Sequence, residues 1–156
     1  MKGFEGFSVL GKEKEAEKRE ENLFQERADF LKENYPLEES HYDLEDLLCN
    51  SLDGKEVIER RDDNGEIEAF MTYDIEEDDE KNEYCSLGIA LTREESRGEG
   101  VMNELFGEIR EIARERDCEY VVGIADTSEG KDFFLSKGFI EDFDKVNKRN
   151  YFRLDL

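Results

Sequence analysis

The chain has 156 residues, the length of one domain with a hydrophobic core, so we expect a single domain over residues 1–156. Its 44 acidic and 22 basic side chains give a formal net charge of −22, yet apolar residues make up 37% of the composition, which favours globular folding. No basic stretch of any length offsets the acidity, so the sequence argues against a nucleic acid partner.

The first 54 residues indicate an edge strand and two helices. Residues 4–10 alternate loosely enough to form the strand. Residues 12–34 are rich in helix formers, their second half carries an apolar stripe, and Pro36 ends that helix. Asp43 is suited to cap a second, short helix with inward leucines, which ends at Asp53-Gly54.

The next segment predicts a β-hairpin. Residues 57–61 and 67–75 are its arms, and Asn64-Gly65 between them is a favoured two-residue turn pair. The second arm alternates between an apolar face and a largely polar one, and an acidic loop over residues 76–83 follows it.

Two apolar runs, residues 85–91 and 120–125, predict buried strands, and a helix follows each of them. A glycine-rich turn, Arg97-Gly98-Glu99-Gly100-Val101-Met102, joins the first run to its helix. Strand, turn and helix together aim several backbone N–H groups and the positive end of a helix dipole at one spot, which suits a phosphate or diphosphate. The turn lacks the third glycine of a dinucleotide fingerprint and the Gly-Lys-Ser/Thr of a P-loop.

The second apolar run leads into Asp126-Thr127-Ser128, a short helix with Phe133 and Phe134, and Lys137-Gly138-Phe139, and residues 151–156 alternate as a last strand. In order and spacing, the motifs over residues 55–156 resemble those of the GNAT superfamily, the acyl-CoA-dependent N-acyltransferases. The resemblance implies an α/β (α+β) fold: a mixed, mostly antiparallel, twisted sheet of six or seven strands with about four helices on both faces. Acyl-CoA would enter a V-shaped gap between the strands at 85–91 and 120–125.

The same resemblance implies an N-acetyltransferase that moves an acetyl group from acetyl-CoA to a primary amine of a small molecule, a polyamine or a protein. The acceptor would lie between residues 35–42 and 145–150. The backbone of the strand at residues 89–91 would polarise the thioester carbonyl and pair with the pantetheine arm. The Thr127 hydroxyl would contact that arm. The implied CoA-binding residues are Ile89, Ala90, Leu91, Arg97, Gly98, Glu99, Gly100, Val101, Met102 and Thr127.

The attacking amine must lose a proton, either to a base or to an ordered water that relays it. Glu83, at the start of the strand that would bind the pantetheine arm, and Glu68, on the neighbouring strand, are the candidate catalytic bases. Both also fit the description of an ordinary surface acid.

The chain departs from the family pattern at two informative positions. Phe134 stands where many members have a tyrosine that protonates the leaving thiolate. Glu99 places a negative charge where Lys or Arg is usual, an effect that Arg93 and Arg97 could offset. Two alternatives therefore stay open: a GNAT-fold module that binds acyl-CoA without turnover, and an acidic interaction protein that needs no CoA.

The cysteines and the single histidine add little chemistry. Cys49, Cys85 and Cys118 form no CxxC pair, and we expect buried, reduced thiols at 85 and 118. His41 lies alone in a loop, and no His/Cys cluster has metal-ligand spacing, so we expect no metal. With no apolar run near ~20 residues and no signal-peptide core, we expect a cytoplasmic monomer or homodimer without a membrane partner.

The acidity itself has three explanations. It can be the salt-adapted surface of a halophilic protein, an attraction for a cationic acceptor such as a polyamine, or mimicry of nucleic acid. The eleven lysines fit the first explanation imperfectly. Net charge acts on solubility and steering rather than on the fold, so the sequence leaves the choice open.

Overall fold

The computed structural model describes every residue except Met1, Glu39 and His41, and the side chains of residues 2–10 also lie outside the description. The single histidine, His41, is therefore outside the described residues. The chain forms two compact units, residues 1–33 and residues 34–156, and each is described by itself.

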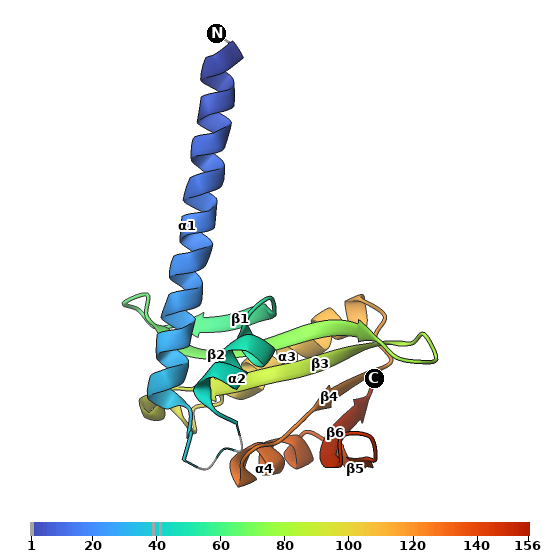
Figure 1. Cartoon of the computed structure of the whole chain (residues 1–156). Helices are drawn as coiled ribbons and strands as arrows, with labels where there is room; N and C mark the ends of the chain where they lie inside the picture. Colours follow the sequence, from blue (N-terminus) through green and yellow to red (C-terminus); the bar gives the residue numbers. More distant parts are fainter. Residues whose placement is uncertain (1, 39, 41) are drawn as a thin grey trace. The chain divides into compact units, whose positions relative to one another are not determined.

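The N-terminal unit belongs to one continuous helix, α1 (Lys2–Asn34), shown in blue in Figure 1. The edge strand expected at residues 4–10 is wrong, because this stretch belongs to α1. Phe4, Phe7 and Leu10 are spaced by three residues, which fits a helical period, whereas a strand would place neighbours in this series on opposite faces. The charged residues 11–22 are exposed, and Ala28 and Leu31 of the second half are buried, as the apolar stripe predicts.

Residues 34–156 hold a six-stranded sheet in the order β1-β2-β3-β4-β6-β5. Only β3 and β4 are parallel, and the other neighbours are antiparallel. This confirms the mixed, mostly antiparallel sheet. The strands are β1 (Glu56–Arg61), β2 (Ile67–Glu77), β3 (Glu83–Thr92), β4 (Tyr120–Gly123), β5 (Ile140–Asp144) and β6 (Arg149–Asp155).

Helices cover both faces of this sheet (Figure 1). On one face, α3 (Val101–Glu115) and α4 (Ser128–Ser136) pack on the main core, in which Met71 and Val121 of the sheet meet Phe106 and Ile109 of α3. On the other face lie α2 (Leu44–Leu47) and a π-helical turn (Leu48–Leu52). Asp43 caps α2 as predicted, because its carboxylate accepts the N–H of Asp46 at 2.8 Å.

The loop between β1 and β2 is longer than the expected two-residue turn. It spans residues 62–66, and the Asp62 carboxylate organises it by accepting the backbone N–H groups of Asn64 and Glu66. Arg93 also binds this carboxylate at 2.7 Å. These polar bonds favour a wider loop than the Asn-Gly pair alone predicts.

Candidate functional site

The central feature is the place where β3 and β4 part. The two strands pair at only three positions, the last of them Ser86 with Val122. Beyond this point β3 continues to Thr92 along β2, whereas β4 ends at Gly123. A cavity of about 710 Å³ opens there, which confirms the predicted gap between the two apolar strands.

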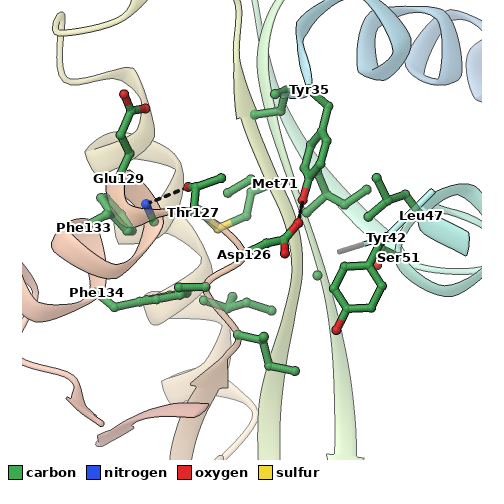
Figure 2. A pocket seen from close by; sticks show the side chains of 18 of the residues that line it. Tyr35, Tyr42, Leu47, Ser51, Met71, Asp126, Thr127, Glu129, Phe133 and Phe134 are labelled. Atoms are coloured by element: carbon green, nitrogen blue, oxygen red, sulfur yellow. Dashed lines mark hydrogen bonds between the residues drawn. The ribbon is translucent and has the colours of Figure 1, made fainter. Parts of the chain in front are cut away.

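The cavity joins the two faces of the sheet (Figure 2). Thr127 and Phe133 line it from the α4 side, Leu47 and Ser51 from the α2 side, and Asp126 lies between them. Residues 86–92 of β3 form the wall that both sides share, and we call the stretch beside Ser86 and Asp126 the neck. Of the predicted CoA-binding residues, those that line the cavity are Ile89, Ala90, Leu91, Arg97, Met102 and Thr127.

The glycine-rich turn presents its backbone in the way the sequence predicts. Gly98 has φ +83° and Gly100, the N-cap of α3, has φ +81°, a region that glycine adopts without strain. Within the described part of the chain, the N–H groups of residues 98–103 donate no hydrogen bond, and no side chain caps α3. A β-carbon at either glycine would meet nothing within 4 Å. The helix N-terminus is therefore open to an anion.

The charges beside this turn differ from the expectation. The Arg93 guanidinium does not offset Glu99, because it binds Asp62 at 2.7 Å and lies 3.7 Å from Glu95. Arg97 donates to the backbone carbonyls of Thr92 and Asn34, each at 3.2 Å, so it fixes the turn while keeping its charge nearby. An anion at this turn would consequently be held mainly by main-chain N–H groups.

Strand β3 carries a bulge where it leaves β4. Tyr73 is opposite Leu87 and Met71 is opposite Ala90, so Thr72 alone faces both Gly88 and Ile89. The N–H of Ile89 donates to the Thr72 hydroxyl at 2.9 Å. Of Ile89, Ala90 and Leu91, the residues predicted to bind the pantetheine arm, Ile89 therefore has an N–H that already donates to a protein oxygen. Bulges of this kind re-aim a strand next to functional sites.

Helix α4 begins at Ser128, after its N-cap Thr127, whose hydroxyl accepts the N–H of Gly130 at 3.1 Å. On this helix Phe134 is 8% exposed and packs on Phe139 and Phe152, with ring centroids 4.8 and 5.2 Å apart. A β-carbon at Gly123 would lie 2.5 Å from the tip of its ring. Phe134 is therefore a core residue that also lines the cavity, and it carries no proton to donate.

Phe134→Ala should destabilise the fold by about 3–5 kcal/mol, the usual cost of removing a buried phenylalanine. Phe143→Ala is the matched control, because Phe143 is 52% exposed and its loss should cost less than about 0.5 kcal/mol. Denaturant unfolding of both variants measures the difference. If the variant at 134 instead kept its stability and lost one limb of the pH–rate profile, residue 134 would have an acid–base role and this interpretation would be wrong.

The structure brings a carboxylate to the neck that the sequence did not single out. Asp126 lies just beyond the end of β4, and its carboxylate accepts a hydrogen bond from the Tyr35 hydroxyl at 2.7 Å (Figure 2). The same carboxylate also accepts the Ser40 hydroxyl. Burial, and then the hydrogen bond to Asp126, raise the pKa of Tyr35 to about 12, so the phenol stays protonated and donates. The signal was present in the sequence: an acid at the carboxyl end of an apolar strand, beside the motif residue Thr127.

The two predicted bases lie elsewhere. Neither Glu83 nor Glu68 is among the residues that line the cavity. Glu83 begins β3, six residues before Ile89, a distance of about 20 Å along a strand. The backbone carbonyl of Glu68 accepts the N–H of Arg93, at the opposite end of β3. Direct proton transfer requires hydrogen-bond contact or one bridging water, and neither carboxylate has it at the neck.

The two segments expected to flank an acceptor do meet at the cavity. Arg149 of the last hairpin donates to the Tyr42 hydroxyl at 3.3 Å, and both residues line the cavity. On the same side, Lys55 and Asp74 form an ion pair of 2.6 Å. This side of the cavity therefore has polar groups of both signs.

The cysteines behave as predicted, since Cys85 and Cys118 are buried free thiols while Cys49 is exposed. Burial raises the pKa of Cys85 to about 12, which makes its thiol unreactive. In the part of the chain that the structure describes, no three His, Cys, Asp or Glu side chains are grouped to hold a metal ion. Among the same residues, no helix is both long and apolar enough to cross a bilayer.

The architecture, the parted strands and the glycine turn are those of the GNAT fold, and solved structures with this fold match the chain. It is similar to a ribosomal-protein-alanine N-acetyltransferase from Brucella melitensis biovar Abortus 2308 (TM-score 0.62, 16% identity, 78% of this chain and 89% of that one). It is also similar to a GNAT-family acetyltransferase from Staphylococcus aureus Mu50 (TM-score 0.57, 14% identity, 73% and 76%).

A third similar structure is the glucosamine N-acetyltransferase region of a fungal multi-domain β-N-acetylglucosaminidase (TM-score 0.64, 17% identity). The match covers 78% of this chain but only 16% of that much longer protein. No model of a protein family matches the sequence, and no curated protein matches it either. The likeness at these identities is one of fold, and the chain has the GNAT fold.

Proposed function

We propose that this protein is an N-acetyltransferase that transfers the acetyl group of acetyl-CoA directly to a primary amine. The observation that carries the proposal is the cavity at the parting of β3 and β4, which lies beside a helix N-terminus with unused N–H groups. Such a gap admits an extended arm along the free side of β3, and the helix N-terminus suits a diphosphate. The GNAT fold of the structural neighbours supports the same activity.

In this proposal the turn from Arg97 to Met102 holds the CoA diphosphate. The pantetheine arm lies along Ile89, Ala90 and Leu91, and the Thr127 hydroxyl contacts it. Because Thr72 already binds the Ile89 N–H, polarisation of the thioester carbonyl falls to the backbone that follows Ile89.

The acceptor amine would enter from the α2 side, past Tyr42 and Arg149, and reach the neck beside Asp126. A carboxylate at this point can accept a hydrogen bond from the amine and stabilise the positive charge that grows on its nitrogen during attack. Two hydroxyls already donate to that carboxylate, which suits it to orienting a donor group. We therefore assign Asp126 to amine orientation and assign proton removal to an ordered water at the neck. Glu83 and Glu68 could receive that proton only through a chain of several waters.

Two measurements test the proposal. Acetyl-CoA should raise the melting temperature of the protein, and a panel of amines should then release free CoA, detected with a thiol reagent. Stabilisation without CoA release from any amine would favour the second candidate, a GNAT-fold module that binds acyl-CoA without turnover; Phe134 and Glu99 are the features that favour it. No stabilisation at millimolar acetyl-CoA in any salt would leave an acidic interaction protein.

Glu99→Lys should tighten CoA binding about three- to tenfold at low ionic strength, because it removes a carboxylate beside the diphosphate and adds a cation. A charge near a helix terminus is worth about 0.3–1 kcal/mol, and this variant changes the charge by two. Glu115→Lys, at the far end of α3 and about 22 Å away, is the matched control and should change the affinity less than twofold. Calorimetric titration measures both; equal effects would show that only net charge matters.

A further inference from the structure

Thr72, in the middle of β2, joins two parts of the cavity wall that are distant in the sequence. Its side chain is 0% exposed, which is unusual for a polar residue in this chain. The hydroxyl donates to the backbone carbonyl of Ser51, in the π-helical turn, at 2.6 Å. The same oxygen accepts the backbone N–H of Ile89, in the β3 bulge, at 2.9 Å. One hydroxyl therefore satisfies both a part-buried acceptor and a buried donor.

The space around this hydroxyl leaves little room for change. A β-carbon at Gly88 would lie 2.2 Å from the Thr72 hydroxyl oxygen and 3.1 Å from the Ser51 carbonyl oxygen. Gly88 is thus required for close approach rather than for a left-handed backbone, since its φ is not positive. Glycine at 88 and a hydroxyl at 72 together allow the bulge to sit directly under the π-helical turn.

The position of this bridge gives it functional meaning. The bulge begins two residues after Ser86, the last position at which β3 pairs with β4, so it lies where the cavity opens. Ser51 lines the α2 side of the cavity and Ile89 lies on the shared β3 wall. We propose that Thr72 is a positioning residue: it holds the bulge in register with the π-helical turn, so that the backbone after Ile89 meets the acyl carbonyl while Ser51 frames the acceptor side. The inference rests on the proposed acetyl transfer.

Loss of the Thr72 hydroxyl would displace the β3 bulge. Without it, the buried Ile89 N–H and the part-buried Ser51 carbonyl lose this partner, and the bulge must shift to find others. Carbonyl polarisation depends on donors that lie about 2.7–3.1 Å from the oxygen, and a misplacement of about 1 Å can lower the rate about a hundredfold. CoA affinity should change much less than the rate, because the proposed diphosphate contacts at the glycine turn and most of the contacts of the pantetheine arm do not involve Thr72.

The test compares two ways of breaking the bridge with two controls. Thr72→Val removes the hydroxyl at nearly constant volume, and Gly88→Ala pushes a methyl group into it from the opposite strand. Thr72→Ser keeps the hydroxyl, and Ile109→Val removes one methylene at a 0%-exposed site in the core on the α3 face of the sheet, away from the bridge. Each variant is measured for CoA affinity, for kcat, and for the infrared carbonyl band of bound acetyl-CoA labelled with ¹³C at the carbonyl, which reports polarisation without requiring turnover.

We expect T72V and G88A to lower kcat about tenfold or more, to keep the CoA dissociation constant within about twofold, and to move the carbonyl band back toward its position in water. T72S and I109V should resemble the wild type in all three readouts. A wild-type band shift that survives in T72V and G88A, with unchanged kcat, overturns the inference alone. A wild-type protein that does not bind acetyl-CoA overturns the proposed function and this inference with it. If T72V does not fold, the three readouts of G88A decide whether the bridge positions the bulge.

Discussion

Gly100→Val is expected to abolish the stabilisation that acetyl-CoA gives to this protein. Gly100 caps α3 with φ +81° in the middle of the run of unused N–H groups, and a side chain there would point into space that the protein leaves open. Two branched methyl groups would occupy the position proposed for the diphosphate. The wild type, with acetyl-CoA at about 100 times its dissociation constant, should gain about 2.7 kcal/mol, or about 5–10 °C in melting temperature.

Valine at a positive φ is also strained, by about 1–2 kcal/mol, so the variant needs a control with the same strain. Gly65, in the loop between β1 and β2, has φ +79°, and a β-carbon at this position would likewise meet no atom within 4 Å. Gly65→Val should lose the same intrinsic stability and keep the full acetyl-CoA shift. If both variants keep the shift, the diphosphate binds elsewhere; if both lose it, the effect is one of folding.

Salt is expected to stabilise this protein strongly. With a formal net charge of −22 on one small domain, the acidic side chains repel one another, and folding brings them closer together. Between about 0.01 M and 1 M salt the Debye length falls from about 30 Å to 3 Å, less than the spacing of most surface charges. We expect the melting temperature to rise by roughly 5–10 °C over this range, equally in KCl and NaCl because screening does not distinguish them.

The rival explanation of the acidity is a specific site for a cationic acceptor. Outside the main cavity, the place best suited to such a site is a second hollow of about 540 Å³. Its acidic lining residues are Asp78, Asp79, Glu80, Glu119 and Asp155. Under this explanation, micromolar spermidine should stabilise the fold far more than KCl of equal ionic strength. A melting temperature that stays flat between about 0.05 M and 2 M KCl would exclude the halophilic explanation and favour the cationic acceptor.

The sequence predicted the elements that carry periodic apolar residues and missed what depends on tertiary contact. The strand–turn–helix order around Gly100 was visible because it rests on local pattern and on glycine, and the parting of the two apolar strands was implied by the resemblance to the GNAT superfamily. The Thr72 bridge was not, since the alternation of β2 gives no hint that a residue on its polar face would be buried beneath the π-helical turn. A bulge also changes register by one residue, which periodicity alone does not reveal.

The choice of candidate catalytic acids was limited in the same way, because it depends on tertiary contacts. In a chain with 44 acidic side chains, composition and position along a strand select Glu83 and Glu68 no better than many others. Only the folded chain shows that Asp126 stands at the neck with two hydroxyls on its carboxylate. The prediction for the first segment failed for a different reason. Its loose alternation indicated a strand, although Phe4, Phe7 and Leu10 recur at the helical spacing of three, and the segment belongs to α1.

A turn that holds its ligand by the main chain leaves almost no trace in side-chain identity. Apart from its two glycines at positive φ, such a turn at residues 98–103 can drift in sequence while its amides stay in place. Alanine scanning of this turn would consequently report on the glycines, on the Glu99 charge and on the buried Val101, and would leave the amides themselves untested. Replacing a single amide by an ester at Met102, which deletes one N–H and keeps the side chain, is the perturbation to which such a turn should respond.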